Sequence, residues 1–282
     1  MSTLVAAAQF TAEPGRCDEN RTRTLRLVEE AAGRGANLVV LPELAVSGYT
    51  LRGEILFAAA EPLDGPTLRA WTDAAQKHSL LIAGGFCEVE GDRLFNSAVL
   101  VGPQGMLLHY RKLHLFDREK LVFARGDKGL EVVDTSIGRI GMCVCYDLRF
   151  VEVMRALALA GADIVAVPTA WVGGFDKVPR DGDGLIGQAR GAIVQANLNQ
   201  TYVVCASQGG SADEINFLGS SLICDPYGAL LAGPASDDIE ETIIAPIDIA
   251  NVQKAQLRSD LIRPRADRRT DVYGLKLGDR NL

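Results

Sequence analysis

Short apolar runs alternate along the chain with longer segments in which apolar residues recur every three or four positions. Runs of roughly 4–8 residues are typical of buried strands, and the longer periodic segments are typical of helices with one buried face. The predicted strands cover 4–9, 38–41, 80–84, 96–101, 107–111, 130–133, 139–145, 164–167, 202–206, 220–224 and 242–247. The predicted helices cover 20–34, 66–77, 151–159, 185–197 and 249–257. This alternation predicts an α/β fold with mixed sheet pairing, and because no linker divides it, one domain over residues 1–282.

Two segments of the chain match almost position by position. GANLVVLPE at 35–43 and GADIVAVPT at 161–169 each enter a strand through Gly-Ala and leave it at a proline. We interpret the match as an internal duplication, in which two related halves face each other and place Glu43 and Thr169 at equivalent strand ends. The alternative is chance similarity between two buried strands rich in valine and leucine.

Composition and charge exclude several classes of partner. The chain has 282 residues, is 48% hydrophobic and carries a net charge of −7 without a basic block, which argues against binding to nucleic acid or to an anionic membrane surface. No apolar run reaches the roughly 20 residues of a membrane span, and we expect no signal peptide. Six cysteines in such a chain indicate a reducing cytoplasm. Three histidines and no H-E-x-x-H motif make a metal site improbable on sequence grounds.

Cys145 is the first candidate for a reactive group. It ends the run at 139–145 and is followed at once by residues 146–150 and then a helix-like segment. A strand that turns sharply into a helix exposes its last side chain beside backbone N–H groups, and a helix N-terminus lowers the pKa of a thiol. The sequence therefore predicts a nucleophile at Cys145, with a buried structural cysteine as the alternative.

Two further charged residues stand at strand ends in apolar surroundings. Glu43 follows the strand at 38–41, and Lys112 follows the strand at 107–111 inside an apolar and aromatic run. Burial of either charge costs free energy unless the group has a partner or a chemical role. Each has a simpler alternative, a carboxylate or an ammonium that faces water. Glu119 lies shortly after Lys112 and is either its partner or an ordinary residue of a helix turn.

Together these residues resemble the signatures of the nitrilase superfamily of carbon–nitrogen hydrolases. The matching segments, in the order of the family, are 41–43, 110–116, 141–150 and, for a later G-x-S and P-x-G element, 219–228. The resemblance covers nearly the whole chain. It implies an αββα sandwich in which Glu43, Lys112 and Cys145 converge at one end of two sheets. It also implies pairing through the helices near 151–159 and 185–197, so that a homodimer or larger homo-oligomer is expected.

The same resemblance implies a reaction. Cys145 attacks the carbonyl carbon of an amide and forms a thioester, while Lys112 and the backbone N–H of Tyr146 stabilise the oxyanion. Glu43 moves the protons, and Glu119 holds Lys112 and the substrate in place. No metal and no cofactor takes part in this scheme.

The residues after the cysteine indicate the kind of substrate. Cys145-Tyr146-Asp147 resembles the amidase and carbamoylase branches, whereas true nitrilases more often have Trp-Glu or Gly-Glu there. The hypothesis is a small aliphatic amide, including one that carries a carboxylate, such as an ω-amide. The alternatives are N-carbamoyl amines or amino acids, then nitriles. The alternative from another class is a catalytically silent binding or scaffold protein. It predicts that one of the triad residues Glu43, Lys112 and Cys145 is missing.

The segment at 169–184 follows the second of the matched strands and is expected to overhang the nucleophile. Thr169 begins it, and Trp171 with Phe175 is expected to form an apolar wall for the acyl group. Arg180 or Lys177 is a candidate for recognising a substrate carboxylate, with a solvated loop as the alternative.

Overall fold

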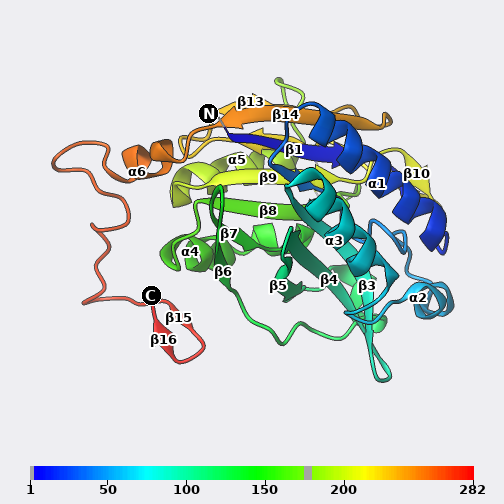
Figure 1. Ribbon diagram of the computed structural model, residues 1–282. Coiled ribbons are helices and arrows are strands. Elements are labelled where there is room, and N and C mark those ends of the chain that lie inside the picture. The colour runs from blue at the N-terminus through cyan, green and yellow to red at the C-terminus, as the bar shows by residue number, and fades with distance from the viewer. Residues whose placement is uncertain (1–2, 175–179) are drawn as a thin grey trace.

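Two six-stranded β-sheets form the centre of the protein in the computed structural model, which describes residues 3–174 and 180–282 (Figure 1). The first sheet has the order β14-β1-β2-β3-β4-β5, with bounds β14 (Glu241–Ile247), β1 (Thr3–Gln9), β2 (Leu38–Val40), β3 (Leu81–Glu90), β4 (Arg93–Gly102) and β5 (Gly105–Arg111). The second has the order β13-β12-β9-β8-β7-β6, with bounds β13 (Leu230–Ala232), β12 (Leu222–Cys224), β9 (Tyr202–Ser207), β8 (Ile164–Thr169), β7 (Gly138–Met142) and β6 (Val132–Thr135). Two short hairpins pair β10 (Ser211–Ala212) with β11 (Ile215–Asn216) and β15 (Lys276–Leu277) with β16 (Arg280–Asn281).

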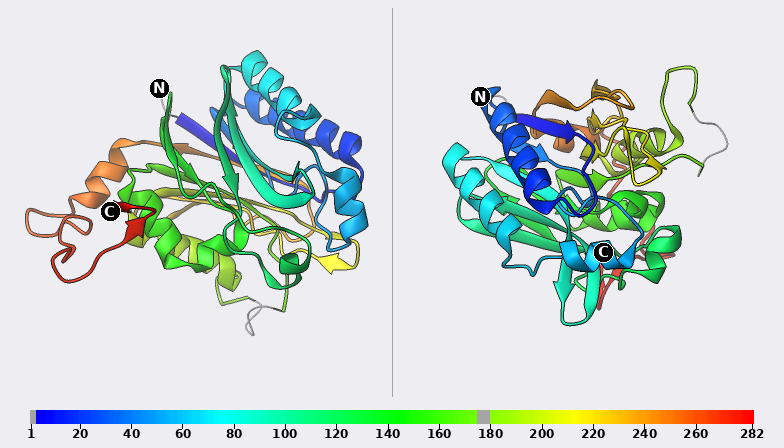
Figure 2. Two further views of the ribbon diagram at one scale, coloured as in Figure 1. Left: turned by 90° about the horizontal axis from the view of Figure 1, so that it is seen from below. Right: turned by 90° about the vertical axis from the view of Figure 1, so that its right-hand side faces the viewer.

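Helices cover the outer faces of both sheets (Figure 2). The helices are α1 (Cys17–Gly33), α2 (Gly53–Ala59), α3 (Pro66–His78), α4 (Val151–Leu159), α5 (Gly187–Asn199) and α6 (Ala250–Gln256), with 3₁₀ turns η1 (Asp117–Leu121) and η2 (Cys145–Arg149). Successive side chains of β1 point to opposite faces of the sheet. Val5 belongs to the core between the sheets, whereas Ala6 packs with α1 and α3. The predicted αββα sandwich is confirmed.

The two sheets share one topology. In the first, β1, β2 and β3 run parallel, with antiparallel neighbours β14 and β4 on either side. In the second, β7, β8 and β9 run parallel, with antiparallel neighbours β6 and β12. The matched segments therefore contain strands with the same place in each sheet, β2 and β8. Internal duplication remains a prediction that this correspondence supports.

The strand predicted at 139–145 is shorter in the structure, and this affects the site. It ends at Met142, and Cys145 has a left-handed backbone with φ of 46° that a β-strand cannot contain. Cys145 starts the turn η2, and α4 begins only at Val151. The predicted strand therefore extends three residues too far, whereas the helix predicted over 151–159 has the bounds of α4.

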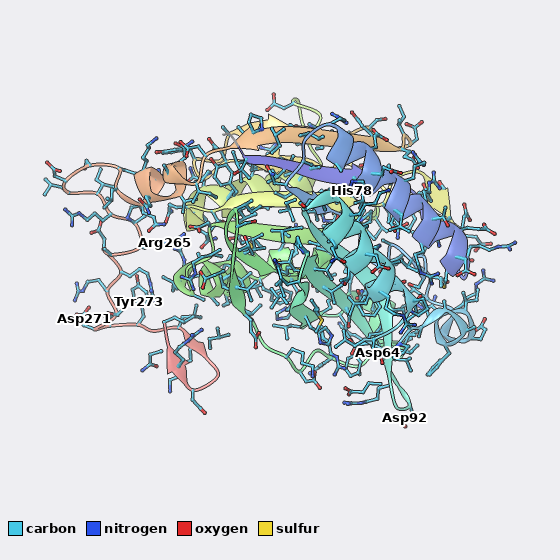
Figure 3. All side chains as sticks on the ribbon, in the orientation of Figure 1. Asp64, His78, Asp92, Arg265, Asp271 and Tyr273 are labelled. Atoms are coloured by element: carbon cyan, nitrogen blue, oxygen red, sulfur yellow. The ribbon has the colours of Figure 1, made fainter. Side chains whose placement is uncertain are left out.

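The C-terminal segment runs along the outside of the sandwich, where Asp271 and Tyr273 lie away from the sheets (Figure 3). Arg265 attaches this segment to the body. Its guanidinium donates to the carbonyl of Ala158 at 2.7 Å in α4 and to those of Asn199 at 2.7 Å and Gln200 at 3.0 Å at the end of α5. One arginine therefore satisfies carbonyls at the ends of two helices. No helix within the described residues is long and apolar enough to span a lipid bilayer.

Candidate active site

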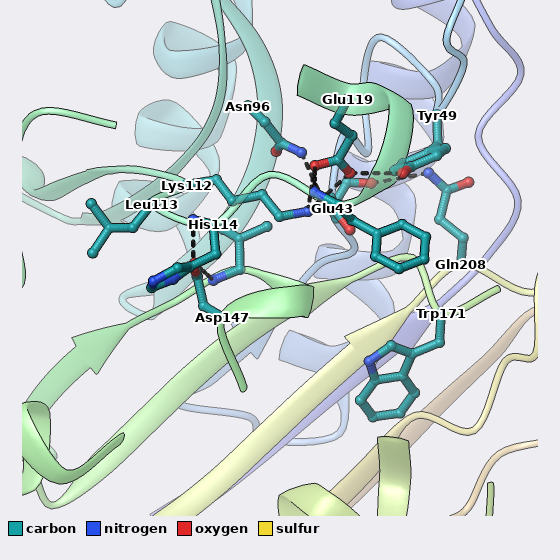
Figure 4. A network of polar contacts seen from close by, with 12 residues as sticks. Glu43, Tyr49, Asn96, Lys112, Leu113, His114, Glu119, Asp147, Trp171 and Gln208 are labelled. Atoms are coloured by element: carbon teal, nitrogen blue, oxygen red, sulfur yellow. Dashed lines mark hydrogen bonds and ion pairs between the residues drawn. The ribbon is translucent and has the colours of Figure 1, made fainter. Parts of the chain in front are cut away.

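Three loops at one end of the sandwich carry the predicted catalytic residues, of which Figure 4 shows Glu43, Lys112 and Glu119 side by side. Glu43 lies just after β2, Lys112 directly after β5, Glu119 in η1 and Cys145 at the start of η2. Glu43 and Lys112 are 69 positions apart in the chain, yet their charged groups are in contact. The ends of the strands, rather than proximity in sequence, place these groups side by side.

Lys112 lies between two carboxylates. Its Nζ donates to Oε1 of Glu43 at 2.6 Å and to Oε1 of Glu119 at 2.9 Å. The three side chains are 0%, 0% and 1% exposed, so the charges interact with little screening by water. Burial alone lowers the pKa of Lys112, but the carboxylates of Glu119 and Glu43 outweigh it and raise that pKa above its usual range. Lys112 is therefore an ammonium throughout the neutral range.

The two oxygens of the Glu43 carboxylate have different surroundings. Oε1 accepts from Lys112 and from Nδ2 of Asn96 at 2.7 Å. Oε2 is buried and has no hydrogen-bond partner among the described residues. Burial raises the pKa of Glu43, Lys112 lowers it, and Glu119 raises it, with a net result above the usual carboxyl value. The free oxygen of this carboxylate is thus able to accept a proton.

The Glu119 carboxylate points at Lys112 rather than into solvent. It also accepts from the Tyr49 hydroxyl at 2.7 Å and from the backbone N–H of Phe116 at 2.9 Å. Burial and the adjacent Glu119 raise the pKa of Tyr49 well above its usual value, so Tyr49 acts as a neutral donor. The alternative of a solvated helix turn at Glu119 is excluded by this geometry.

Cys145 is partly buried, and its surroundings favour the thiol. Burial and the Glu43 carboxylate raise its pKa well above the usual value, while Lys112 and the backbone N–H of Ala170 act in the opposite direction. The lowered pKa predicted for Cys145 was wrong, because burial and the Glu43 carboxylate outweigh the groups that favour the thiolate. A thiol of this kind needs a base when it reacts.

A small apolar pocket opens above Cys145. It is lined by Tyr49, Phe116, Glu119, Cys145, Tyr146, Leu148, Arg149, Ala170, Trp171, Val172, Gln188 and Gly191. The space open to the centre of a water molecule is about 40 Å³, enough for a few waters or a short acyl group. A wider vestibule outside it shares Tyr49, Phe116, Tyr146 and Val172.

Comparison with known proteins identifies the kind of site. The profile of the carbon–nitrogen hydrolase family matches residues 4–256. The chain belongs to the carbon–nitrogen hydrolase family. It is 36% identical over 271 residues to a nitrilase of Pyrococcus abyssi, covering 95% of this chain and 98% of that one. It is 31% identical to an (R)-stereoselective amidase of a Pseudomonas species, covering 93% and 90%. Among solved structures, Saccharomyces cerevisiae Nit3 of the nitrilase superfamily superposes with a TM-score of 0.80 at 25% identity, covering 94% and 96%.

In this carbon–nitrogen hydrolase, the three residues predicted to bind substrate have different positions. Tyr146 and Trp171 line the pocket. Thr169 does not line it: it ends β8, fully buried, and its carbonyl accepts from the backbone N–H of Glu43 at 3.2 Å. Thr169 is the last residue of β8 and pairs with Ser207 of β9. This pairing keeps Thr169 in the sheet, behind Glu43.

Of the two residues predicted to bind a substrate carboxylate, Arg180 does not line the hydrolase pocket. Arg180 forms an ion pair with Asp237 and donates to the carbonyl of Gly184 at 2.6 Å, so its guanidinium is engaged elsewhere. Lys177 and Phe175 lie outside the described residues. Arg149 is the cationic side chain among the residues that line the pocket.

Three polar residues of the hydrolase site were not predicted. Tyr49 bonds to Glu119, Asn96 bonds to Glu43, and Gln208 donates to the Glu43 carbonyl at 2.9 Å. Asn96 and Gln208 carried a signal, because each is an amide in or directly after an apolar strand and needs buried partners. Tyr49 carried none, since its neighbours 47–50 form an ordinary polar turn.

Proposed function

We propose that the protein hydrolyses the C–N bond of small non-peptide amides to a carboxylic acid and ammonia through a thioester on Cys145. The proposal depends above all on one observation: a free carboxylate oxygen of Glu43 and the ammonium of Lys112 are buried together beside a thiol that opens onto a small apolar pocket. A scaffold protein would have no need to maintain buried charges, which are costly unless they are used.

The first half of the reaction forms the thioester. Sγ of Cys145 attacks the amide carbon while Oε2 of Glu43 takes the thiol proton, which offsets the raised pKa of the thiol. Negative charge then develops on the substrate oxygen and is stabilised by Lys112 and the backbone N–H of Tyr146, each worth about 3 kcal/mol on the scale of lost oxyanion donors. Glu43 returns the proton to the departing nitrogen, the C–N bond breaks, and ammonia leaves.

The second half hydrolyses the thioester with the same groups. Glu43, ionised again, takes a proton from a water molecule that attacks the thioester carbon. Lys112 again stabilises the oxyanion, the C–S bond breaks, and Glu43 returns the proton to the sulfur of Cys145. Glu119 keeps Lys112 between the two carboxylates in both halves. Tyr49 and Asn96 each donate to the carboxylate oxygen that Lys112 also contacts, on Glu119 and Glu43 respectively.

The pocket favours a small acyl group. Trp171, Leu148 and Val172 provide apolar walls for a short aliphatic chain. Arg149, at the rim, is suited to a terminal carboxylate of an ω-amide. The alternatives are N-carbamoyl compounds, whose carbonyl carbon presents the same geometry to Cys145, and nitriles.

The test is ammonia release from a panel of short amides, ω-amides, N-carbamoyl amines and nitriles. We expect the highest kcat/KM on short amides and no turnover in Cys145→Ala. Cys17→Ala is the matched control, because Cys17 lies in α1 with its thiol against the carbonyl of Ala59. Turnover that survives in Cys145→Ala overturns the mechanism, and no turnover across the panel favours the scaffold alternative.

We further propose a homodimer or larger homo-oligomer in a reducing, cytoplasmic setting, and a single domain. Val151 of α4 and Val194 and Leu198 of α5 are 59%, 48% and 50% exposed on neighbouring helices, which supports pairing through this face. The six free cysteines fit a reducing compartment, and the shared core between the sheets fits one domain. Light scattering of the purified protein is expected to give about twice the mass of one chain or more, and a monomer contradicts the pairing.

A further inference from the structure

The proposed base and the nucleophile belong to different sheets. Glu43 follows β2 of the first sheet, and Cys145 follows β7 of the second. Apolar packing between sheets is non-directional and does not by itself fix two groups to within the fraction of an ångström that proton transfer needs. Directional bonds across the interface are therefore the contacts that set the distance from Oε2 of Glu43 to the thiol.

The backbone of Glu43 is held from the second sheet on both sides. Its N–H donates to the carbonyl of Thr169 at 3.2 Å, and its carbonyl accepts from Nε2 of Gln208 at 2.9 Å. On the other flank Gly85 approaches so closely that an added Cβ would lie 2.8 Å from Cα of Glu43. The following residue, Leu44, has a left-handed φ of 49°. A strained backbone of this kind persists only where its surroundings determine it.

Gln208 is placed to make this connection. It directly follows β9 and is fully buried, and its backbone N–H donates to Thr169 at 3.2 Å. Its side chain crosses to the first sheet, where Nε2 reaches Glu43 and Oε1 accepts from the N–H of Ala12 at 3.0 Å. One amide from the second sheet thus contacts the loops after both β1 and β2. Gln208 lies beside Glu43 in Figure 4 and does not line the pocket.

We propose that Gln208 is a positioning residue for the reaction, which fixes Glu43 against Cys145 by linking the two sheets at the Glu43 carbonyl. This inference rests on the proposed function, because it requires Glu43 to take the thiol proton. Loss of the amide leaves the pocket intact but lets the carboxylate move away from the thiol. The expected signature is a lower kcat with little change in KM.

The experiment compares Gln208→Met with Gln9→Met. Gln9 is a matched control: it is fully buried at the end of β1, and its side chain bonds Ile239 at 3.0 Å and Ser221 at 2.9 Å without touching Glu43. Both changes remove one buried amide of similar shape. The readouts are kcat and KM for a short amide and the rate at which iodoacetamide alkylates Cys145, followed by mass spectrometry. We expect roughly 10- to 100-fold losses of kcat and of alkylation rate in Gln208→Met, and changes within about threefold in Gln9→Met.

A double variant tests whether the effect passes through Glu43. In Glu43→Gln the base is absent, so adding Gln208→Met is expected to slow alkylation no further. The inference is wrong if Gln208→Met slows alkylation equally in the wild type and in Glu43→Gln. It is also wrong if Gln208→Met behaves like Gln9→Met. If Glu43→Gln alone leaves alkylation unchanged, the proposed function fails instead. Should Gln208→Met not fold, Gln208→Glu, which keeps the acceptor for Ala12, takes its place with the same criteria.

Discussion

At the scale of single residues, the site is governed by one ammonium between two buried carboxylates. Lys112 bonds both Glu43 and Glu119, and it lowers the pKa of Glu43 against the opposing effects of burial and of Glu119. The arrangement leaves Glu43 as a base of raised pKa and Cys145 as a thiol. Because the thiol is the resting form, Glu43 is expected to remove its proton as the sulfur attacks, which is general base catalysis.

Replacing Lys112 by methionine is expected to reduce kcat by about 10²- to 10³-fold, because the charged oxyanion donor is lost. The two carboxylates are then left without their shared partner, and at least one becomes protonated. Stopped or continuous ammonia assays give the rate, and circular dichroism checks the fold. A folded Lys112→Met enzyme with near-normal kcat contradicts the role of Lys112.

The decrease of kcat/KM at low pH is expected to follow the protonation of the Glu43 carboxylate. Because its pKa is raised above the usual 4.5, protonation disables the base at a higher pH than for an ordinary glutamate, and kcat/KM falls as pH decreases through that value. Glu119 raises the pKa of Glu43, so Glu119→Gln is expected to move this decrease to lower pH while kcat also falls. A decrease centred at or below pH 4.5 in the wild type, or a shift to higher pH in the variant, contradicts the assignment.

At the scale of elements, helix α5 contains a glycine where alanine is the better helix former. Gly191 lines the pocket, and among the described residues no atom beyond its chain neighbours and the adjacent backbone of α5 lies within 4 Å of the position a Cβ would take. Its missing side chain leaves room for substrate at a cost to the helix. Gly191 therefore affects both the stability of α5 and the size of the pocket.

Gly191→Ala is expected to stabilise the fold by about 0.5–1 kcal/mol and to shift activity toward shorter acyl groups. Gly33→Ala is the control, since Gly33 ends α1 and also has free space around its Cβ position. Thermal unfolding and kcat/KM across a series of amides measure both effects. Unchanged acyl preference in Gly191→Ala contradicts the role in pocket size.

Strands β3, β4 and β5 carry a second buried ion cluster, which includes the residue directly before Lys112. The Glu88 carboxylate accepts from Ser97, from His109 at 2.8 Å and from Nε of Arg111 at 3.1 Å. Burial opposes ionisation, but these donors lower the pKa of Glu88 to about 2. Arg111 ends β5 and directly precedes Lys112, so this cluster fixes the strand that presents the ammonium.

The lowered pKa of Glu88 makes a stability prediction with a definite sign. Its contribution, roughly 3 kcal/mol from the shift, is fully present above pH 4.5 and disappears as pH falls toward 2. Glu88→Gln is thus expected to be less stable than wild type at pH 7, with a difference that shrinks at acid pH. Urea unfolding at several pH values measures it, and a difference that grows on acidification contradicts the prediction.

At the scale of the whole molecule, long-range contacts hold the ends of the sandwich in place. Arg265 ties the C-terminal segment to the ends of α4 and α5. Gln9 and Gln208 each link the two sheets, Gln208 at Glu43 and Gln9 at Ser221. The site is therefore a property of the assembled sandwich rather than of either sheet.

Arg265→Gln is expected to release the C-terminal segment and to lower the stability of the body by about 1–3 kcal/mol, because buried helix carbonyls lose their donors. Limited trypsin digestion should then cleave after residue 257 faster than in the wild type. Arg269→Gln, which removes an exposed pair with Asp271, is the control and is expected to change neither. Equal cleavage in both variants contradicts the attachment.

The sequence by itself determined the layered α/β architecture, the family and the residues at the centre of the site. Apolar periodicity follows from local geometry, and Glu43, Lys112 and Cys145 each stand at the end of a strand, where the pattern breaks. The tertiary structure alone decided that Asn96 and Tyr49 bond the carboxylates, that Gln208 bonds the backbone carbonyl of Glu43, and that Thr169 lies behind Glu43. It also decided that Cys145 rests as a thiol, because a pKa depends on burial and on charges from distant parts of the chain, which no local pattern encodes.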